Sequence, residues 1–278
     1  MRSRRKLLAR VGWNALGLAV FGVMVFPVYW MVATAFKPGH DILAYTPVWL
    51  PTSPTLGNFH DAMSRAYFWT DVKNSLIIVS AVVSLSLVIG FLAALALAKF
   101  RFYGRKAFIV LIIGVQMVPL TALIIPLYIT LSRAHQVNTL TGVIIMYLTF
   151  VLPFTVWTLR GFIMGIPRDL EEAAMVDGAT RFGAFARILL PLVGPGLVAT
   201  SIFAFIQAWN EFIIAYVFLH DSDKQTLTVW LASFTTLRGT DWGPLMAGAT
   251  LTALPVVTFF VLVQRKIAFG LTAGAVKA

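Results

Sequence analysis

The stretch SLIIVSAVVSLSLVIGFLAALALA, residues 75–98, decides what kind of fold this chain adopts. Apart from four serines, its residues are all apolar or glycine, and none is charged. A helix that crosses the hydrocarbon of a bilayer needs about 20 mainly apolar residues, and this stretch has 24. We therefore predict a transmembrane helix here.

Five further stretches of the same kind predict an all-α integral membrane protein with six transmembrane helices. The 278-residue sequence is 59% hydrophobic and 12% charged, and its mean hydropathy is +0.85. A water-soluble domain of this length could not bury so much apolar surface, and six long apolar runs are too many for its core. The predicted spans are residues 12–36, 75–98, 107–131, 140–164, 197–219 and 245–268.

The distribution of lysine and arginine predicts the orientation of these spans. With the N-terminus in the cytoplasm, 16 of the 22 basic residues fall in cytoplasmic segments and 6 in external ones. Cytoplasmic connections carry the excess of lysine and arginine, so we expect both termini inside. Residues 1–11 then form a basic N-terminus, residues 12–268 the transmembrane domain and residues 269–278 a cytoplasmic tail. The net charge of +11 is explained by the lysine and arginine residues on the cytoplasmic side of a protein embedded in membrane lipid. No nucleic-acid partner is therefore expected.

A charged segment, residues 165–191, lies on the predicted cytoplasmic side. It contains EEAAMVDGATRFGAFARILLP, residues 171–191. Acids such as Glu171 suit the start of a helix, Gly178 suits the left-handed conformation that ends one, and Thr180 can cap the next. We predict a short helix, a tight turn and a second helix.

Two kinds of surface could receive this segment. A helix that lies on lipid headgroups is usually rich in lysine and arginine, because the inner leaflet is anionic. Residues 168–177 carry four acidic groups and one basic group. A protein partner with a basic cleft therefore fits better than lipid, and Ala173 and Ala174 would let the two backbones approach closely.

The same segment resembles the EAA loop of binding-protein-dependent ABC importer permeases. The fixed positions of that motif are occupied by Glu172, Ala173, Ala174, Gly178, Ile188, Leu190 and Pro191. Residues 74–106 and the C-terminal GLTAGAVK, residues 270–277, are similar to the G-type permease subunit of maltose importers. Apart from the basic N-terminus, the resemblance covers nearly the whole chain.

The resemblance implies the type I ABC importer architecture, in which a coupling helix seats in a cleft of a cytoplasmic ATPase. The coupling residues it implies are Glu171, Glu172, Ala173, Ala174, Asp177, Gly178, Ala179, Ile188 and Pro191. In the tail, it implies contacts with the ATPase from Gly270, Gly274 and Lys277. The sequence contains no GxxxxGK[ST] motif, so we expect no cofactor on this chain, with ATP and Mg²⁺ on the partner ATPase.

The implied function is the permease subunit of an ATP-driven importer of di- or oligosaccharides in a bacterial or archaeal cytoplasmic (inner) membrane. The implied partners are a second permease subunit in a heterodimer, an ATPase dimer, and an extracytoplasmic sugar-binding lipoprotein or periplasmic protein. An importer of glycerol-phosphate or another polar solute is an alternative, as is a stand-alone secondary transporter, although no inverted repeat is apparent. An enzyme is not expected, because the four histidines are scattered and there is no cysteine, which leaves no catalytic or metal site.

A second candidate site is QAWNE, residues 207–211. Glu211 is the acid within a predicted span, and facing lipid would cost it about 3 kcal/mol or more, so it must face protein or water. The cluster then lines the solute path or the contact between two permeases, and the resemblance favours the second role. The candidate residues are Gln207, Trp209, Asn210 and Glu211, with Gln116 in the third span. Three aromatic residues could stack on a sugar or anchor the membrane interface, namely Tyr128, Tyr147 and Trp157.

Overall fold

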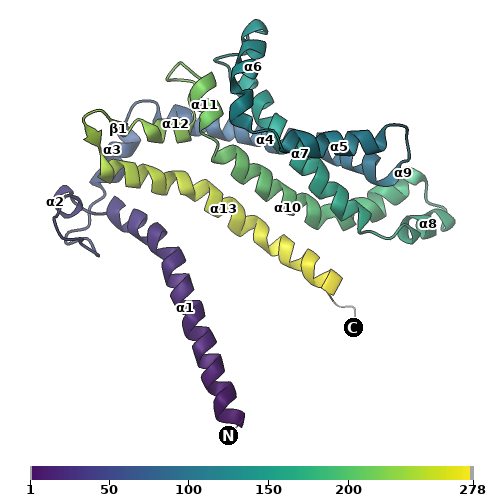
Figure 1. The fold of residues 1–278 in the computed structure, drawn as a ribbon, viewed down its shortest axis with the longest axis horizontal. Coiled ribbons are helices and arrows are strands. Elements are labelled where there is room, and N and C mark those ends of the chain that lie inside the picture. The colour runs from purple at the N-terminus through teal and green to yellow at the C-terminus, as the bar shows by residue number, and fades with distance from the viewer. Residues whose placement is uncertain (1, 276–278) are drawn as a thin grey trace. The chain divides into compact units, whose positions relative to one another are not determined.

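A computed structural model describes the backbone of residues 2–275 and the side chains of residues 10–264 (Figure 1). The long helices are α1 (Arg2–Ala35), α4 (Phe68–Lys99), α7 (Leu140–Met164), α10 (Leu190–Trp209) and α13 (Trp242–Ala275). The shorter helices are α2 (Gly39–Ile42), α3 (Gly57–Ser64), α5 (Arg105–Gln116), α6 (Leu120–Arg133), α8 (Asp169–Val176), α9 (Arg181–Ala184), the π-helix η1 (Phe185–Leu189), α11 (Ile213–Phe218) and α12 (Leu227–Ala232). Strands β1 (Thr235–Thr236) and β2 (Gly239–Thr240) pair antiparallel.

The expectation of an all-α membrane protein is confirmed. Within the described residues, five helices are long and apolar enough to cross a membrane, and six if a bent pair counts as one span. Helix α7 coincides with the predicted span 140–164. On α4, Val88 and Leu92 are 61% and 58% exposed, which is the surface that a lipid-facing helix presents.

The third predicted span, residues 107–131, is wrong as a single continuous helix. Helices α5 and α6 meet at a bend of 102°. Pro119 stands immediately before α6 with φ −59°. Because its ring fixes φ and leaves no N–H to donate, proline suits the start of a helix and interrupts the one before it.

The fifth predicted span, residues 197–219, is wrong at both ends. Helix α10 begins at Leu190, with Pro191 in its first turn, where a missing N–H is tolerated. It ends at Trp209, and residues 210–212 separate it from α11. The polar sequence 207–211 therefore straddles a helix break.

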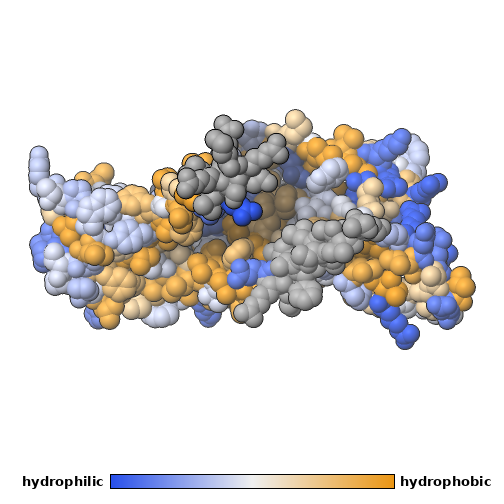
Figure 2. Space-filling model, turned by 90° about the horizontal axis from the view of Figure 1, so that it is seen from below, coloured by the Kyte–Doolittle hydropathy of each residue, from blue (hydrophilic) through white to orange (hydrophobic). Residues whose placement is uncertain are grey.

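The chain forms two compact units. One comprises the chain up to Phe68 together with Leu231–Ala253, and the other comprises Trp69–Trp230 together with the chain from Leu254 onward. The coupling segment, Gln116 and residues 207–211 all belong to the second unit. In Figure 2, hydrophilic side chains gather at the right-hand end, where Figure 1 places α8 and α9.

Small residues allow the helices of the second unit to approach closely. A Cβ added at Gly196 of α10 would lie 2.5 Å from the ring of Phe162 in α7, and α7 lies along α10 (Figure 1). A Cβ at Gly90 of α4 would lie 2.5 Å from the side chain of Thr155, also in α7. Between membrane helices, where water drives no association, such packing contributes much of the attraction.

Candidate functional site

Helix α8 presents an acidic surface. None of its residues is buried, and its first turn carries Asp169, Glu171 and Glu172. Negative charge at this end interacts favourably with the helix dipole. Within the described part of the chain, Glu172 is exposed and takes part in no ion pair. Its carboxylate is therefore available to a partner.

The turn after α8 is a Schellman motif. Gly178 has a φ of +89°, the Ala179 N–H donates to the Ala174 carbonyl at 2.9 Å, and the Gly178 N–H donates to the Met175 carbonyl at 3.1 Å. This pair of bonds satisfies carbonyls that the end of a helix leaves free, and it requires a left-handed residue. No atom lies within 4 Å of a Cβ added at Gly178. Glycine is therefore required here by the backbone conformation and not by crowding.

The second helix of the segment begins where the sequence predicted it. The Thr180 hydroxyl accepts a hydrogen bond from the Gly183 N–H at 3.0 Å and caps α9. The chain then passes through η1 directly into α10. The prediction of a helix, a tight turn and a second helix is confirmed. We call residues 169–189 the elbow.

The elbow is tied to the membrane helices by charge and by apolar contact. Lys99, at the end of α4, forms an ion pair with Glu171, and the two side chains are 14% and 22% exposed. Leu189 of η1 is buried with Ile163 of α7 and Val193 of α10 in one apolar cluster, against which Phe185 packs. The buried α4 members of this cluster are Phe91, Ala94 and Ala98. A displacement of the elbow must therefore move these helices or break these contacts.

The elbow also exposes apolar side chains. Val176 is 86% exposed and Phe182 is 76% exposed. A cavity of about 640 Å³ opens beside Phe182, and its lining also includes Lys99, Glu171 and Glu172. Exposed apolar groups next to unpaired acids are typical of a surface that binds protein.

The structure places the remaining predicted coupling residues on the same segment. Ala173, Asp177 and Pro191 are exposed, whereas Ala174, Ala179 and Ile188 are half-buried. In the tail, Gly270 and Gly274 fall in the last turns of α13, where only the backbone is described, and Lys277 lies outside the described residues. The sequence reasoning missed Lys99. Its position in the last turn of an apolar span was the available signal.

Glu211 acts as a helix cap, so the prediction that it lies inside a helix is wrong. Its carboxylate oxygens accept hydrogen bonds from the Ile214 N–H at 2.9 and 3.1 Å and from the Ala215 N–H at 3.2 Å. These are among the first N–H groups of α11, which have no partner within the helix. The Glu211 carbonyl accepts hydrogen bonds from the hydroxyls of Thr228 at 2.8 Å and Tyr147 at 3.4 Å. Glu211 therefore joins three segments of the chain.

The other residues of this cluster differ in their exposure to solvent. Gln207 and Asn210 are exposed, and Asn210 donates to the Ile206 carbonyl at 3.0 Å. Trp209 is buried and stacks on Phe205, with ring centroids 5.5 Å apart. Exposed Gln207 and Asn210 remain candidates for the solute path or the permease contact, and buried Trp209 belongs to the packing of α10.

Gln116 and the aromatic candidates lie in separate places. Gln116 is exposed at the end of α5, and no hydrogen bond among the described residues joins it to residues 207–211. Tyr147 is 1% exposed, so its ring is closed to a solute. Tyr128 packs near Phe218, with ring centroids 5.4 Å apart. Trp157 is 43% exposed, as an interfacial anchor would be.

Comparison with known proteins agrees with this geometry. Residues 57–272 match the family described as the binding-protein-dependent transport system inner membrane component. The chain is 47% identical to the diacetylchitobiose uptake system permease protein of Streptomyces coelicolor, with 99% of each chain covered. It is 34% identical to the trehalose/maltose transport system permease protein of Thermococcus litoralis, again with 99% of each covered.

Its fold matches a chain in the crystal structure of a bacterial ABC transporter involved in the import of the acidic polysaccharide alginate. The TM-score is 0.77 at 22% identity, with 94% of this chain and 96% of that chain covered. The family match extends over most of the sequence, and the relatives match it from end to end. The chain therefore belongs to the family of binding-protein-dependent transport system inner membrane components and is a multi-pass permease subunit of a transporter.

Proposed function

We propose that this chain is the permease subunit of an ATP-driven importer of di- or oligosaccharides, and that a separate ATPase binds α8. The solute class is supported by relatives named for the transport of diacetylchitobiose, arabinooligosaccharides and trehalose or maltose. The observation that carries the coupling role is the attachment of an exposed acidic helix to the spans. Helix α8 is held by the Lys99–Glu171 ion pair and by its contact with η1.

In this proposal, the elbow converts motion of the ATPase into motion of the solute path. A basic cleft on the ATPase receives Glu172, and the exposed Val176 and Phe182 add apolar contact area. When ATP binding and hydrolysis close and open the ATPase dimer, the elbow moves with it. Because the apolar cluster joins the elbow to α4, α7 and α10, these helices shift together and the path opens alternately to the two sides.

The proposal includes the other partners that the family resemblance implies. The elbow lies in the cytoplasm together with both termini, and the tail residues Gly270, Gly274 and Lys277 reach toward the ATPase. A second permease subunit completes the path, and exposed Gln207 and Asn210 face either that path or the second permease. A binding protein delivers the solute from outside. ATP and Mg²⁺ act on the ATPase, and this chain supplies no catalytic group.

Reconstitution tests the coupling role. The chain is co-purified with its second permease and ATPase, placed in liposomes, and supplied with the binding protein and solute. Glu172→Arg should lower uptake and solute-stimulated ATP hydrolysis by roughly tenfold or more, because a central charged contact at an interface often contributes 2 kcal/mol or more. Asp61→Asn, a change at an exposed residue of α3, is the control and should leave both activities unchanged.

Three outcomes would overturn parts of the proposal. Uptake by the chain alone without ATP, or full activity of Glu172→Arg, would remove the coupling role. Identification of the solute carried by the binding protein tests the substrate class separately. A glycerol-phosphate or another solute that is not a saccharide would contradict the saccharide assignment and leave the coupling role intact.

A further inference from the structure

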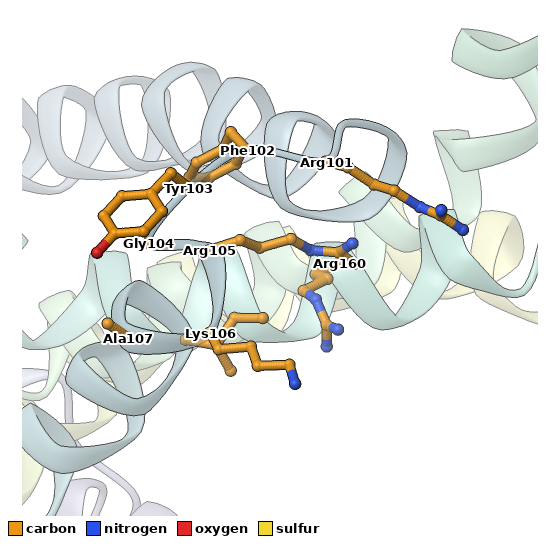
Figure 3. A pocket seen from close by; sticks show the side chains of 9 residues that line it. Arg101, Phe102, Tyr103, Gly104, Arg105, Lys106, Ala107 and Arg160 are labelled. Atoms are coloured by element: carbon orange, nitrogen blue, oxygen red, sulfur yellow. The ribbon is translucent and has the colours of Figure 1, made fainter.

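A second pocket, unconnected with the proposed coupling role, lies at the connection between α4 and α5. It has a volume of about 750 Å³ and is lined by residues 101–107, Ile109 and Arg160. Figure 3 shows Arg105, Lys106 and Arg160 extending into one region, with Arg101 reaching outward from the end of α4. We call this the basic pocket. It holds four cationic side chains, and no acidic side chain lines it.

The charges of the basic pocket are not neutralised within the described part of the chain, where Arg160 has a cation–π contact with the Trp157 ring, 5.5 Å from its centroid. The Nε atoms of Arg105 and Arg160 are buried and have no hydrogen-bond partner. None of the ion pairs formed within residues 10–264 involves a residue of this pocket. Leaving a buried donor without an acceptor destabilises the structure around it. The cationic side chains that line the pocket also repel one another, so an anion is favoured there, and none of the described residues supplies one in an ion pair.

The backbone adds a second attraction for an anion at the same place. Helix α5 begins at Arg105, directly after Gly104, and no side chain caps its N-terminus. Gly104 has a φ of +85°, which glycine adopts readily and which turns the chain sharply from α4 into α5. The first N–H groups of a helix, together with its dipole, favour negative charge.

The surroundings of the pocket indicate a ligand that also carries hydrocarbon. Phe102 is 46% exposed and Tyr103 is fully exposed. On α5, Val110 and Leu111 are 68% and 59% exposed, so exposed apolar side chains follow the pocket along this helix. Aromatic residues beside basic ones mark the headgroup level of a membrane. The pocket also follows directly on a candidate span, Phe68–Lys99.

We propose that the basic pocket binds the phosphate headgroup of an anionic phospholipid. The phosphate lies between Arg105 and Arg160 at the start of α5, and the acyl chains run along Val110 and Leu111. Basic pockets between transmembrane helices bind anionic headgroups by the same physics. The bound lipid holds the α4–α5 connection against α7. With the N-terminus in the cytoplasm, as in the proposed function, the pocket lies at the cytoplasmic leaflet, and no other step of this inference rests on that topology.

Lipid binding to the full-length chain, co-purified with its partners in detergent, tests this proposal. Fluorescent phosphatidylglycerol is titrated against the protein, with phosphatidylcholine as the zwitterionic reference. Arg105→Gln combined with Arg160→Gln should weaken phosphatidylglycerol binding by roughly tenfold or more and leave the weaker phosphatidylcholine binding unchanged. Arg133→Gln combined with Arg238→Gln removes two exposed charges elsewhere and should have little effect.

Competition distinguishes the source of the phosphate. Excess inorganic phosphate should not displace the lipid, because it lacks the contacts with α5. Displacement by inorganic phosphate would indicate a site for the free ion and overturn the proposal. Unchanged phosphatidylglycerol binding by the double variant would also overturn the proposal. A double variant that no longer co-purifies with the ATPase but still binds phosphatidylglycerol would overturn it too, because the two arginines would then serve the ATPase contact. If the double variant does not fold, Lys106→Gln should still weaken phosphatidylglycerol binding severalfold relative to Arg133→Gln.

Discussion

Lys99, in the last turn of α4, forms an ion pair with Glu171, in the first turn of α8, across 72 residues of sequence. Each residue also suits the dipole of its own helix, since a cation lies at a C-terminus and an anion at an N-terminus. Both side chains are more than three-quarters buried, so water screens the pair less than it would a surface pair. The pair is the polar link between a transmembrane helix and the elbow.

Lys99→Met should loosen the elbow and weaken coupling. The Glu171 carboxylate stays partly buried and loses its charged hydrogen bond to Lys99. Such a bond stabilises a structure by about 1.5–3 kcal/mol. Residues 168–180 should then exchange amide hydrogen faster, and less solute should be taken up per ATP hydrolysed. The reciprocal exchange Lys99→Glu with Glu171→Lys should recover part of the coupling, and Glu171→Lys alone should not. Wild-type exchange rates in Lys99→Met would contradict the link.

Substitutions at Gly178 should uncouple in a graded order. Gly178→Ala should cost about 1–2 kcal/mol, because a Cβ disfavours the left-handed conformation. Gly178→Asn should cost less, since asparagine tolerates this conformation. Gly178→Pro should be the most severe, because proline fixes φ near −65° and lacks the N–H that bonds to Met175. The ratio of uptake to ATP hydrolysis measures coupling, and the amount of protein in the membrane checks insertion. Normal coupling by Gly178→Pro would refute the elbow's role.

Gly196→Ala should destabilise the contact of α7 with α10. The added Cβ would lie 2.5 Å from the Phe162 ring, and such overpacking typically costs about 1–3 kcal/mol. The melting temperature of the detergent-solubilised protein reports this cost. Gly194→Ala is the matched control, because no atom lies within 4 Å of its added Cβ. Equal shifts for the two variants would show that the contact with Phe162 is not the cause, and Phe162→Leu should restore stability to Gly196→Ala.

Glu211→Ala should lower stability without changing solute affinity. It removes the acceptor for the first N–H groups of α11, and loss of a helix cap costs about 0.5–2 kcal/mol. Glu211→Gln retains one carbonyl oxygen as an acceptor and should cost less. Melting temperature and the KM for uptake separate the two possible roles. A changed KM in Glu211→Gln at an unchanged melting temperature would assign Glu211 to the solute path.

Local physics made much of the fold predictable from sequence. The mainly apolar run at residues 140–164, which contains Pro153 and Arg160, matches α7, because in lipid a helix satisfies the polar groups of its own backbone. Gly178 and Thr180 were also recognisable from the sequence, because the residues that cap a helix act within a few residues of that helix. The break between α5 and α6 was harder to foresee. Pro126 lies within α6 whereas Pro119 precedes it, so proline alone does not predict a bend.

The sequence by itself determined that this chain crosses a membrane several times and that an acidic helix, a glycine turn and a capped helix interrupt its spans. These features depend on hydrophobicity and on hydrogen bonds between near neighbours. Only the tertiary structure decided that Lys99 holds Glu171, that Glu211 caps α11, and that Arg105 and Arg160 share a pocket. Each of those relationships depends on where the packed helices bring charged groups, and charges attract or repel across space regardless of their separation in sequence.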